Sequence, residues 1–128
     1  MLELARQVEV IAGFTQLQKG ITLNPGVIKG GTKTNVVAAE AELSGDIRFW
    51  KTNDGESVVR KLHRLRPVDG RCRIPVEAGL NRPALERTPA VRRHFQHARK
   101  IGLELGLDLQ EASTGGASDG NFVAALGV

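Results

Sequence analysis

Between Val37 and Phe49, apolar and polar residues alternate along the chain. Apolar side chains at every second position, with charged or small polar ones between them, are typical of a strand with one buried and one wet face. A shorter run, Ile21–Lys29, precedes it and contains Pro25, which lacks the N–H that a ladder needs. The pattern therefore predicts a long strand and a second one that is an edge, a bulge or a bend at Asn24–Gly26.

Helices are expected on both sides of these strands. Apolar residues recur at three- and four-residue intervals over Leu2–Gln18, as on one face of a helix. A second helix is predicted from Asn53, which has the capping-box spacing to Glu56, up to Pro67, and a short strand, Arg71–Ala78, would follow. The order helix, strand, strand, helix, strand favours an α+β fold, an antiparallel sheet with two helices on one face.

The last third of the chain has different features. Gly79–Arg87 has the composition of a linker, and Thr88 followed by a proline predicts the start of a third helix that stops at Gly106. A glycine-rich loop, Ser113–Asn121, leads into the first turns of a helix. Such a loop either presents N–H groups to an anion or simply connects two elements, with Asp119 as the cap; both interpretations stay open.

Composition and charge exclude several classes of protein. The chain has 128 residues and a formal net charge of +4, and none of its apolar runs approaches the ~18–20 residues of a membrane span. A single cysteine, Cys72, excludes an internal disulfide framework and a cysteine-built zinc site, and we expect it to be a buried strand thiol. We expect a cytoplasmic protein with no membrane partner.

Two clusters could carry other chemistry. Basic residues gather over Arg60–Arg73, but no aromatic side chain lies among them to stack bases, so a solvated face is favoured over a nucleic-acid partner. His94 and His97 have a metal-ligand spacing on a helix, yet no carboxylate or cysteine stands nearby to complete a site. We assign no catalytic residue and no metal ligand in this chain, His63 included.

Four stretches together resemble a known family. In order and spacing they are similar to segments of the zinc-dependent exopeptidases and deacylases, which include glutamate carboxypeptidase, succinyl-diaminopimelate desuccinylase and aminoacylase. The stretches are GVIKGGTKTNVV at Gly26–Val37, DIR at Asp46–Arg48, NRP at Asn81–Pro83 and TGGASDGN at Thr114–Asn121.

The resemblance implies two regions. Residues 1–78 would be most of a peptidase dimerisation (lid) domain, a four-stranded antiparallel sheet with two helices, lacking its first strand. Residues 79–128 would be a partial α/β segment of the zinc-hydrolase catalytic domain. The family's zinc ligands and catalytic glutamate fall outside the matching stretches, so zinc is implied for the full-length family and none is expected to bind this chain.

Substrate-binding residues can be carried over. The resemblance implies that Asn35, Arg48 and Arg82 contact polar groups of a small carboxylate-bearing peptide or N-acyl amino acid, since arginine bonds carboxylates bidentately. The same holds for the glycine-rich loop, at Gly115, Gly116 and Ser118. For Arg48 the alternative is an ordinary solvent-facing strand arginine.

Spacing adds an inference about assembly. Asn35 and Arg48 are 13 residues apart in the sequence, roughly 43 Å along an unbroken strand. One small substrate would then reach both from a single subunit only if the strand folded back; otherwise one of them would come from a second subunit. We therefore expect a homodimer through an edge of the lid domain, in a truncated amidohydrolase that is inactive alone. The alternative is a non-catalytic homodimerisation module.

Overall fold

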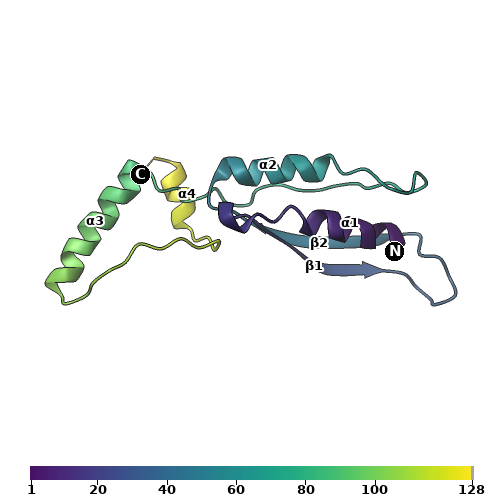
Figure 1. Ribbon diagram of the computed structural model, residues 1–128, viewed down its shortest axis with the longest axis horizontal. Helices are drawn as coiled ribbons and strands as arrows, with labels where there is room; N and C mark the ends of the chain where they lie inside the picture. The colour runs from purple at the N-terminus through teal and green to yellow at the C-terminus, as the bar shows by residue number, and fades with distance from the viewer. Residues whose placement is uncertain (128) are drawn as a thin grey trace.

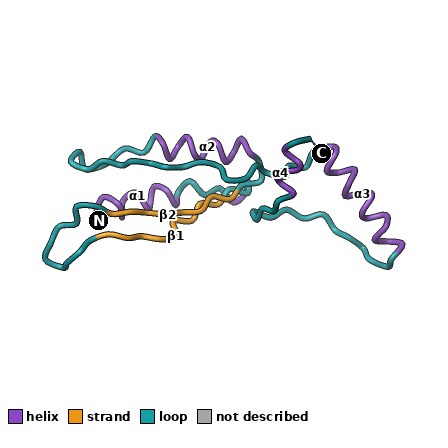
Figure 2. The backbone as a smooth tube through the Cα atoms, turned by 180° about the vertical axis from the view of Figure 1, so that it is seen from behind, coloured by secondary structure: helices purple, strands orange, loops and turns teal. Residues whose placement is uncertain are grey.

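A β-hairpin with two helices on one side forms the N-terminal part of the protein, as the computed structural model of residues 1–127 shows (Figures 1 and 2). The two strands are antiparallel and make a two-stranded sheet. The α+β fold with two helices on one face is confirmed. The elements, in chain order, are α1 (Leu2–Ala12), the 3-10 helix η1 (Leu17–Lys19), β1 (Thr22–Gly30), β2 (Ala41–Arg48) and α2 (Thr52–His63).

The predicted irregularity in the first strand is a β-bulge. Thr22 pairs with Arg48 at one end of the hairpin, and the register shifts by one residue between Pro25 and Val27. Because proline has no N–H to give the ladder, an extra residue at this point costs the sheet little. The bulge leaves β1 paired with β2 on both sides of the irregularity.

The second strand is shorter than the alternation predicted. β2 begins at Ala41, because β1 ends at Gly30 and residues 31–40 form a loop with no strand beside them. Val37 in this loop is 94% exposed. Within β2 the alternation holds, since Leu43 and Ile47 pack against the core while the residues between them are exposed.

The first helix is also shorter than expected, ending at Ala12 rather than at Gln18. The reason is a tertiary contact: the Thr15 hydroxyl accepts a hydrogen bond from the Leu23 N–H at 3.0 Å and donates one to the Leu23 carbonyl at 3.3 Å. Gln16 and Ile21 form an isolated β-bridge next to it. Pairing with β1 thus replaces the last α-helical turns: the helix prediction is wrong over residues 13–16, and Leu17–Lys19 form a separate short 3-10 helix, η1.

The start of α2 differs from the predicted capping box. The helix begins one residue before Asn53, its N-cap is Lys51, and no side chain caps it. The Glu56 carboxylate instead lies 3.6 Å from the Arg60 guanidinium, one turn along the same face. Gly55 is buried because the Phe49 ring lies against it, and a Cβ there would come within 2.8 Å of that ring.

The core lies between the hairpin and the two helices. Five apolar side chains from α1, α2 and the region of β1 are buried, and Val58 is the most enclosed of them at 1% exposure. Half-buried side chains, including Leu65, Val76 and Ala78, surround them. The buried set is Ile11, Ile21, Leu23, Val58 and Leu62.

The short strand expected at Arg71–Ala78 is not formed. The segment runs extended beside α2, and its side chains alternate between exposed and half-buried from Arg71 to Leu80, but no strand within residues 1–127 pairs with it. Val76 and Ala78 anchor it to the core. The strand prediction is wrong because the alternating pattern predicts only which side chains are buried. A β-ladder also requires a second strand next to the segment. Cys72 is accordingly a half-buried free thiol outside any strand.

The C-terminal region forms a separate arm of the elongated molecule (Figure 1). It holds α3 (Pro89–Glu104) and α4 (Gly120–Ala125). Thr88 caps α3 as predicted, its hydroxyl accepting from the Val91 N–H, and Gly106 adopts φ +76° just beyond the helix end. Apolar side chains near the end of α3 are uncovered, since Ile101 and Leu103 are 43% and 57% exposed.

Much apolar surface of the chain lacks a covering element. The solvent-accessible area is 9843 Å², against about 6600 Å² for a compact chain of this 13.8 kDa mass.

None of the helices in residues 1–127 is long and apolar enough to cross a membrane.

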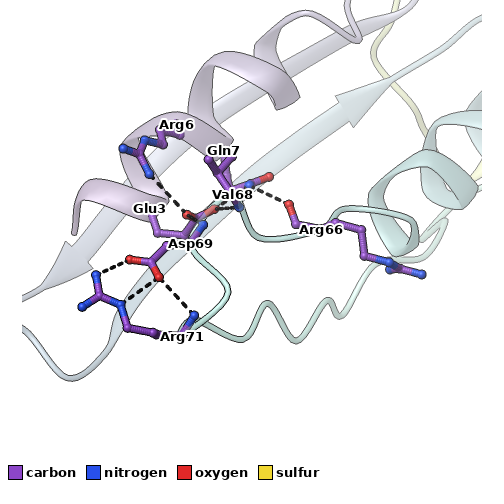
Figure 3. A network of polar contacts seen from close by, with 7 residues as sticks. All are labelled: Glu3, Arg6, Gln7, Arg66, Val68, Asp69 and Arg71. Atoms are coloured by element: carbon purple, nitrogen blue, oxygen red, sulfur yellow. Dashed lines mark hydrogen bonds and ion pairs between the residues drawn. The ribbon is translucent and has the colours of Figure 1, made fainter.

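A polar network fastens the start of α1 to the turn after α2 (Figure 3). The Glu3 carboxylate accepts hydrogen bonds from the backbone N–H groups of Val68 and Asp69, at 3.1 and 3.0 Å, and from the Gln7 amide at 2.7 Å. These bonds, Gln7 first, lower the pKa of Glu3 below its ordinary value. In the same turn the Arg71 guanidinium lowers the pKa of Asp69.

A pH-dependent stability follows from Glu3. Because its pKa is lower in the folded protein, the stability it adds is fully present above the ordinary glutamate pKa of about 4.3 and is lost as the pH falls through the depressed value. Glu3→Gln should therefore lower the thermal midpoint at pH 7, and the gap from the parent chain should close toward pH 2. Glu9→Gln, on an exposed position of the same helix, is the control for circular dichroism melts. A gap independent of pH would contradict this role.

Candidate functional site

The candidate substrate-binding residues gather where β2 ends and the glycine-rich loop returns to the hairpin. Arg48, the last residue of β2, is exposed, and its Nε lies 2.9 Å from an Asp46 carboxylate oxygen. The loop packs on the stem of this arginine, since a Cβ on Gly115 would lie 3.0 Å from the Arg48 Cβ. A small hollow of about 320 Å³ lies beside them, lined also by Trp50.

Arg82 lies on the segment that leads into the C-terminal arm and faces the same loop. Its Nη1 is 3.2 Å from a carboxylate oxygen of Asp119, and its guanidinium lies over the Phe122 ring, 5.3 Å from the centroid. Asp119 occupies the N-cap position of α4 but makes no capping hydrogen bond. The expected cap is therefore wrong, and the carboxylate pairs with Arg82 instead.

The glycine-rich loop is held by a residue that sequence reasoning did not single out. Asn121 is 7% exposed; its side-chain amide donates to the Pro83 carbonyl at 2.9 Å, and its side-chain oxygen accepts from the Ser118 N–H at 2.9 Å. Gly116 N–H donates to the Thr114 hydroxyl at 3.2 Å. An asparagine closing such a loop is a plausible turn residue, but nothing in the sequence indicates a partner 38 residues away.

Asn35 lies apart from the other candidates. It is exposed in the loop at the far end of the hairpin, beyond the start of β2, whereas Arg48 is the last residue of that strand. The structure thus brings together Arg48, Arg82, Gly115, Gly116 and Ser118, all lining one groove, and leaves Asn35 outside it.

The histidines do not form a metal site. Within residues 1–127, no three histidine, cysteine or acidic side chains gather closely enough to hold an ion. His94 and His97 are exposed on α3. The residues described do not fit the zinc that the resemblance implies for the full-length family, so no step through zinc is assigned to them.

Several basic side chains already have partners. Arg71 lies 2.7 Å from Asp69 and Lys61 lies over the Phe14 ring at 5.5 Å. On the arm, Arg87 forms a bidentate pair with Glu111, which lowers the pKa of that carboxyl. Within the basic segment Arg60–Arg73, Arg71 is therefore paired with Asp69, and Lys61 lies against an aromatic ring.

The fold and the site define a small α+β domain with an unpaired sheet edge and an arginine-lined groove. The family model of the peptidase dimerisation domain, found in the M20 peptidases, matches residues 3–67. The chain therefore belongs to this family of dimerisation domains. Comparison with the curated proteins gives no match.

Proposed function

We propose that the chain pairs two subunits and helps to bind substrate in an M20 metallopeptidase or amidohydrolase of the glutamate carboxypeptidase type. Such an enzyme hydrolyses an amide or peptide bond beside a free carboxylate. The observation that carries this proposal is the dimerisation-domain match over residues 3–67, in a structure whose β1 has no strand on its outer edge among residues 1–127.

The outer edge of β1 is the proposed dimer surface. An unpaired strand edge is a template for pairing with another chain. Val27 and Ile28 on this strand are 51% and 49% exposed, and Leu2 and Val10 on α1 are also exposed. A two-fold axis beside β1 would join the two hairpins into one sheet and cover these side chains.

Two arginines, each in an ion pair with an aspartate, are suited to bind a substrate carboxylate. Arg48 and Arg82 present planar guanidinium groups, and both are held by exposed aspartates. Exposed ion pairs contribute only about 0–1 kcal/mol, so an incoming carboxylate can replace Asp46 or Asp119 at little cost. Gly115, Gly116 and Ser118 border the same place, and Asn35 would reach the substrate from the partner subunit.

The dimer is tested by sedimentation velocity over a range of concentrations. The parent chain should dimerise, and Val27→Glu should weaken association at least tenfold because it places a charge in the interface. Val68→Glu is the matched control, since Val68 is 66% exposed in the turn after α2. Equal dissociation constants for the two variants would exclude the β1 edge, and a monomeric parent chain would exclude the proposal.

The catalytic part is tested by zinc stoichiometry in native mass spectrometry, with turnover of a panel of N-acyl amino acids. Zinc and a general base are proposed to belong to the rest of such an enzyme, so this chain should bind no tight zinc and show no turnover. One tight zinc with turnover would contradict this and make His63, His94, His97 and Asp119 the ligands to replace. A dimer that binds no N-acyl amino acid favours the non-catalytic dimerisation module.

A further inference from the structure

A short linker, residues 82–87, connects the hairpin and its two helices to the C-terminal arm. On the α2 side, the Ala84 N–H donates to the Thr52 hydroxyl at 3.1 Å, and the Glu86 carboxylate accepts from the Thr52 N–H at 3.0 Å. Among the hydrogen bonds and ion pairs of residues 1–127, those that join residues 1–71 to residues 79–127 all involve Thr52. One threonine therefore supplies the polar attachment of the arm.

Glu86 takes the place of a helix cap. The first N–H groups of a helix have no partner within it, so they need an acceptor from elsewhere. α2 has no side-chain cap of its own, since its N-cap residue is Lys51. A carboxylate is favoured at this end of a helix because the aligned peptide dipoles make it positive. Glu86, 34 residues further along the chain than Thr52, therefore both caps α2 and holds the linker on it.

The residues next to Ala84 and Glu86 are bonded to the arm instead. The Pro83 carbonyl accepts from the Asn121 amide at 2.9 Å. The Arg87 guanidinium has its bidentate carboxylate partner on the arm. Neighbouring residues of the linker thus hold opposite sides, and the arm cannot turn about α2 while both sets of bonds are made.

This attachment places the two candidate substrate-binding arginines relative to each other. Arg48 lies four residues before Thr52, and Arg82 lies two residues before Ala84, whereas 34 residues separate the two arginines along the chain. The hydrogen bond between Thr52 and Ala84 therefore closes a short path from one arginine to the other. Both arginines line the same groove as the glycine-rich loop, whose Gly115 lies against the stem of Arg48.

We propose that Thr52 and Glu86 are positioning residues, which hold Arg48 and Arg82 at the separation at which both contact one substrate. This rests on the proposed function, in which the two arginines bind polar groups of a small carboxylate-bearing substrate. Without the two bonds at Thr52, the arm turns about the linker and carries Arg82 away from Arg48. The substrate then meets one arginine at a time, so its affinity falls although both side chains are still present.

The attachment is tested by amide hydrogen exchange in the full chain, followed by nuclear magnetic resonance. Thr52→Val keeps the shape of the side chain but removes the hydroxyl, so the Ala84 N–H should exchange at least tenfold faster. Thr52→Ser keeps the hydroxyl and should restore the parent rate. The Ser118 N–H, which is bonded to Asn121 within the arm, is the internal control and should not change in either variant.

Two results of this exchange experiment would overturn the proposal. The first is an equal Ala84 rate in the parent chain and in Thr52→Val, which would mean that the hydroxyl does not hold the linker. The second is a Ser118 rate that rises together with that of Ala84, because the bond would then maintain the fold of the arm rather than its position.

The positioning role is tested by calorimetric titration with N-benzoylglycine, a small N-acyl amino acid. Thr52→Val and Glu86→Ala should each weaken its binding at least fivefold. Thr52→Ser should bind as the parent chain does, and so should the control Glu9→Ala, at an exposed position of α1. Equal affinity of the parent chain, Thr52→Val and Glu86→Ala would overturn the positioning role and leave the proposed function standing. A parent chain that binds no N-benzoylglycine would contradict substrate binding in the proposed function, and the positioning role would fall with it.

Discussion

Val58→Asp is expected to leave the protein unfolded at 25 °C, so that its thermal melt shows no cooperative transition. The side chain is 1% exposed in a core that has five buried apolar residues in the described part of the chain, so a carboxylate there has neither water nor a partner. An uncompensated buried charge costs about 3–5 kcal/mol, which approaches the 5 kcal/mol lower end of domain stability. The measurement is thermal melting followed by far-ultraviolet circular dichroism.

The control for this substitution is Val68→Asp. Val68 is 66% exposed, and surface changes of this kind usually fall within about 0.5 kcal/mol. The comparison separates burial from the mere introduction of an acidic residue. A Val58→Asp variant that melted within a few degrees of the Val68→Asp variant would show that the core does not hold this part of the chain together.

Gly20→Ala is expected to destabilise the protein by about 2–5 kcal/mol. Gly20 has φ +66°, a left-handed conformation that costs other residues about 1–2 kcal/mol. A Cβ there would also lie 1.9 Å from a ring carbon of Trp50, and such overpacking adds about 1–3 kcal/mol. Urea denaturation measures the loss. Trp50 is the single tryptophan, so its emission should shift as the ring is displaced.

Gly31→Ala isolates the backbone part of that cost. Gly31 has φ +78° but no atom within 4 Å of its would-be Cβ. The substitution should therefore cost only the stability that a left-handed backbone takes from a non-glycine residue, and it should leave the tryptophan emission unchanged. Equal losses for the two variants would mean that the Trp50 ring moves aside freely.

Local features that depend on a single residue could be predicted from the sequence. Pro25 cannot donate to a ladder, and the strand is bulged there; Thr88 and Pro89 start a helix, and the helix is there. The alternation around Leu43 also predicted which face of β2 is buried. Each of these depends on the chemistry of the residue itself or on a short-range period.

Features that depend on a partner far away in the sequence could not be predicted. Thr15 leaves the helix because Leu23 offers it two hydrogen bonds, and Asn121 closes its loop through the Pro83 carbonyl. The segment Arg71–Ala78 has the side-chain pattern of a strand, but the pattern contains no information about whether an edge lies next to it. In the candidate site, motif similarity pointed to Arg48 and Arg82, whereas their aspartate partners became evident only in the fold.

The bulge in β1 also limits how many copies of the domain can join through its sheet edges. A sheet with an open edge on each side could add further copies without end and grow into a tape. Between Pro25 and Val27 the spacing of β1 is broken, so only short stretches of that edge remain regular. In the proposed dimer, this break limits the registers in which two β1 edges can pair, so we expect a closed pair about a two-fold axis rather than a fibre.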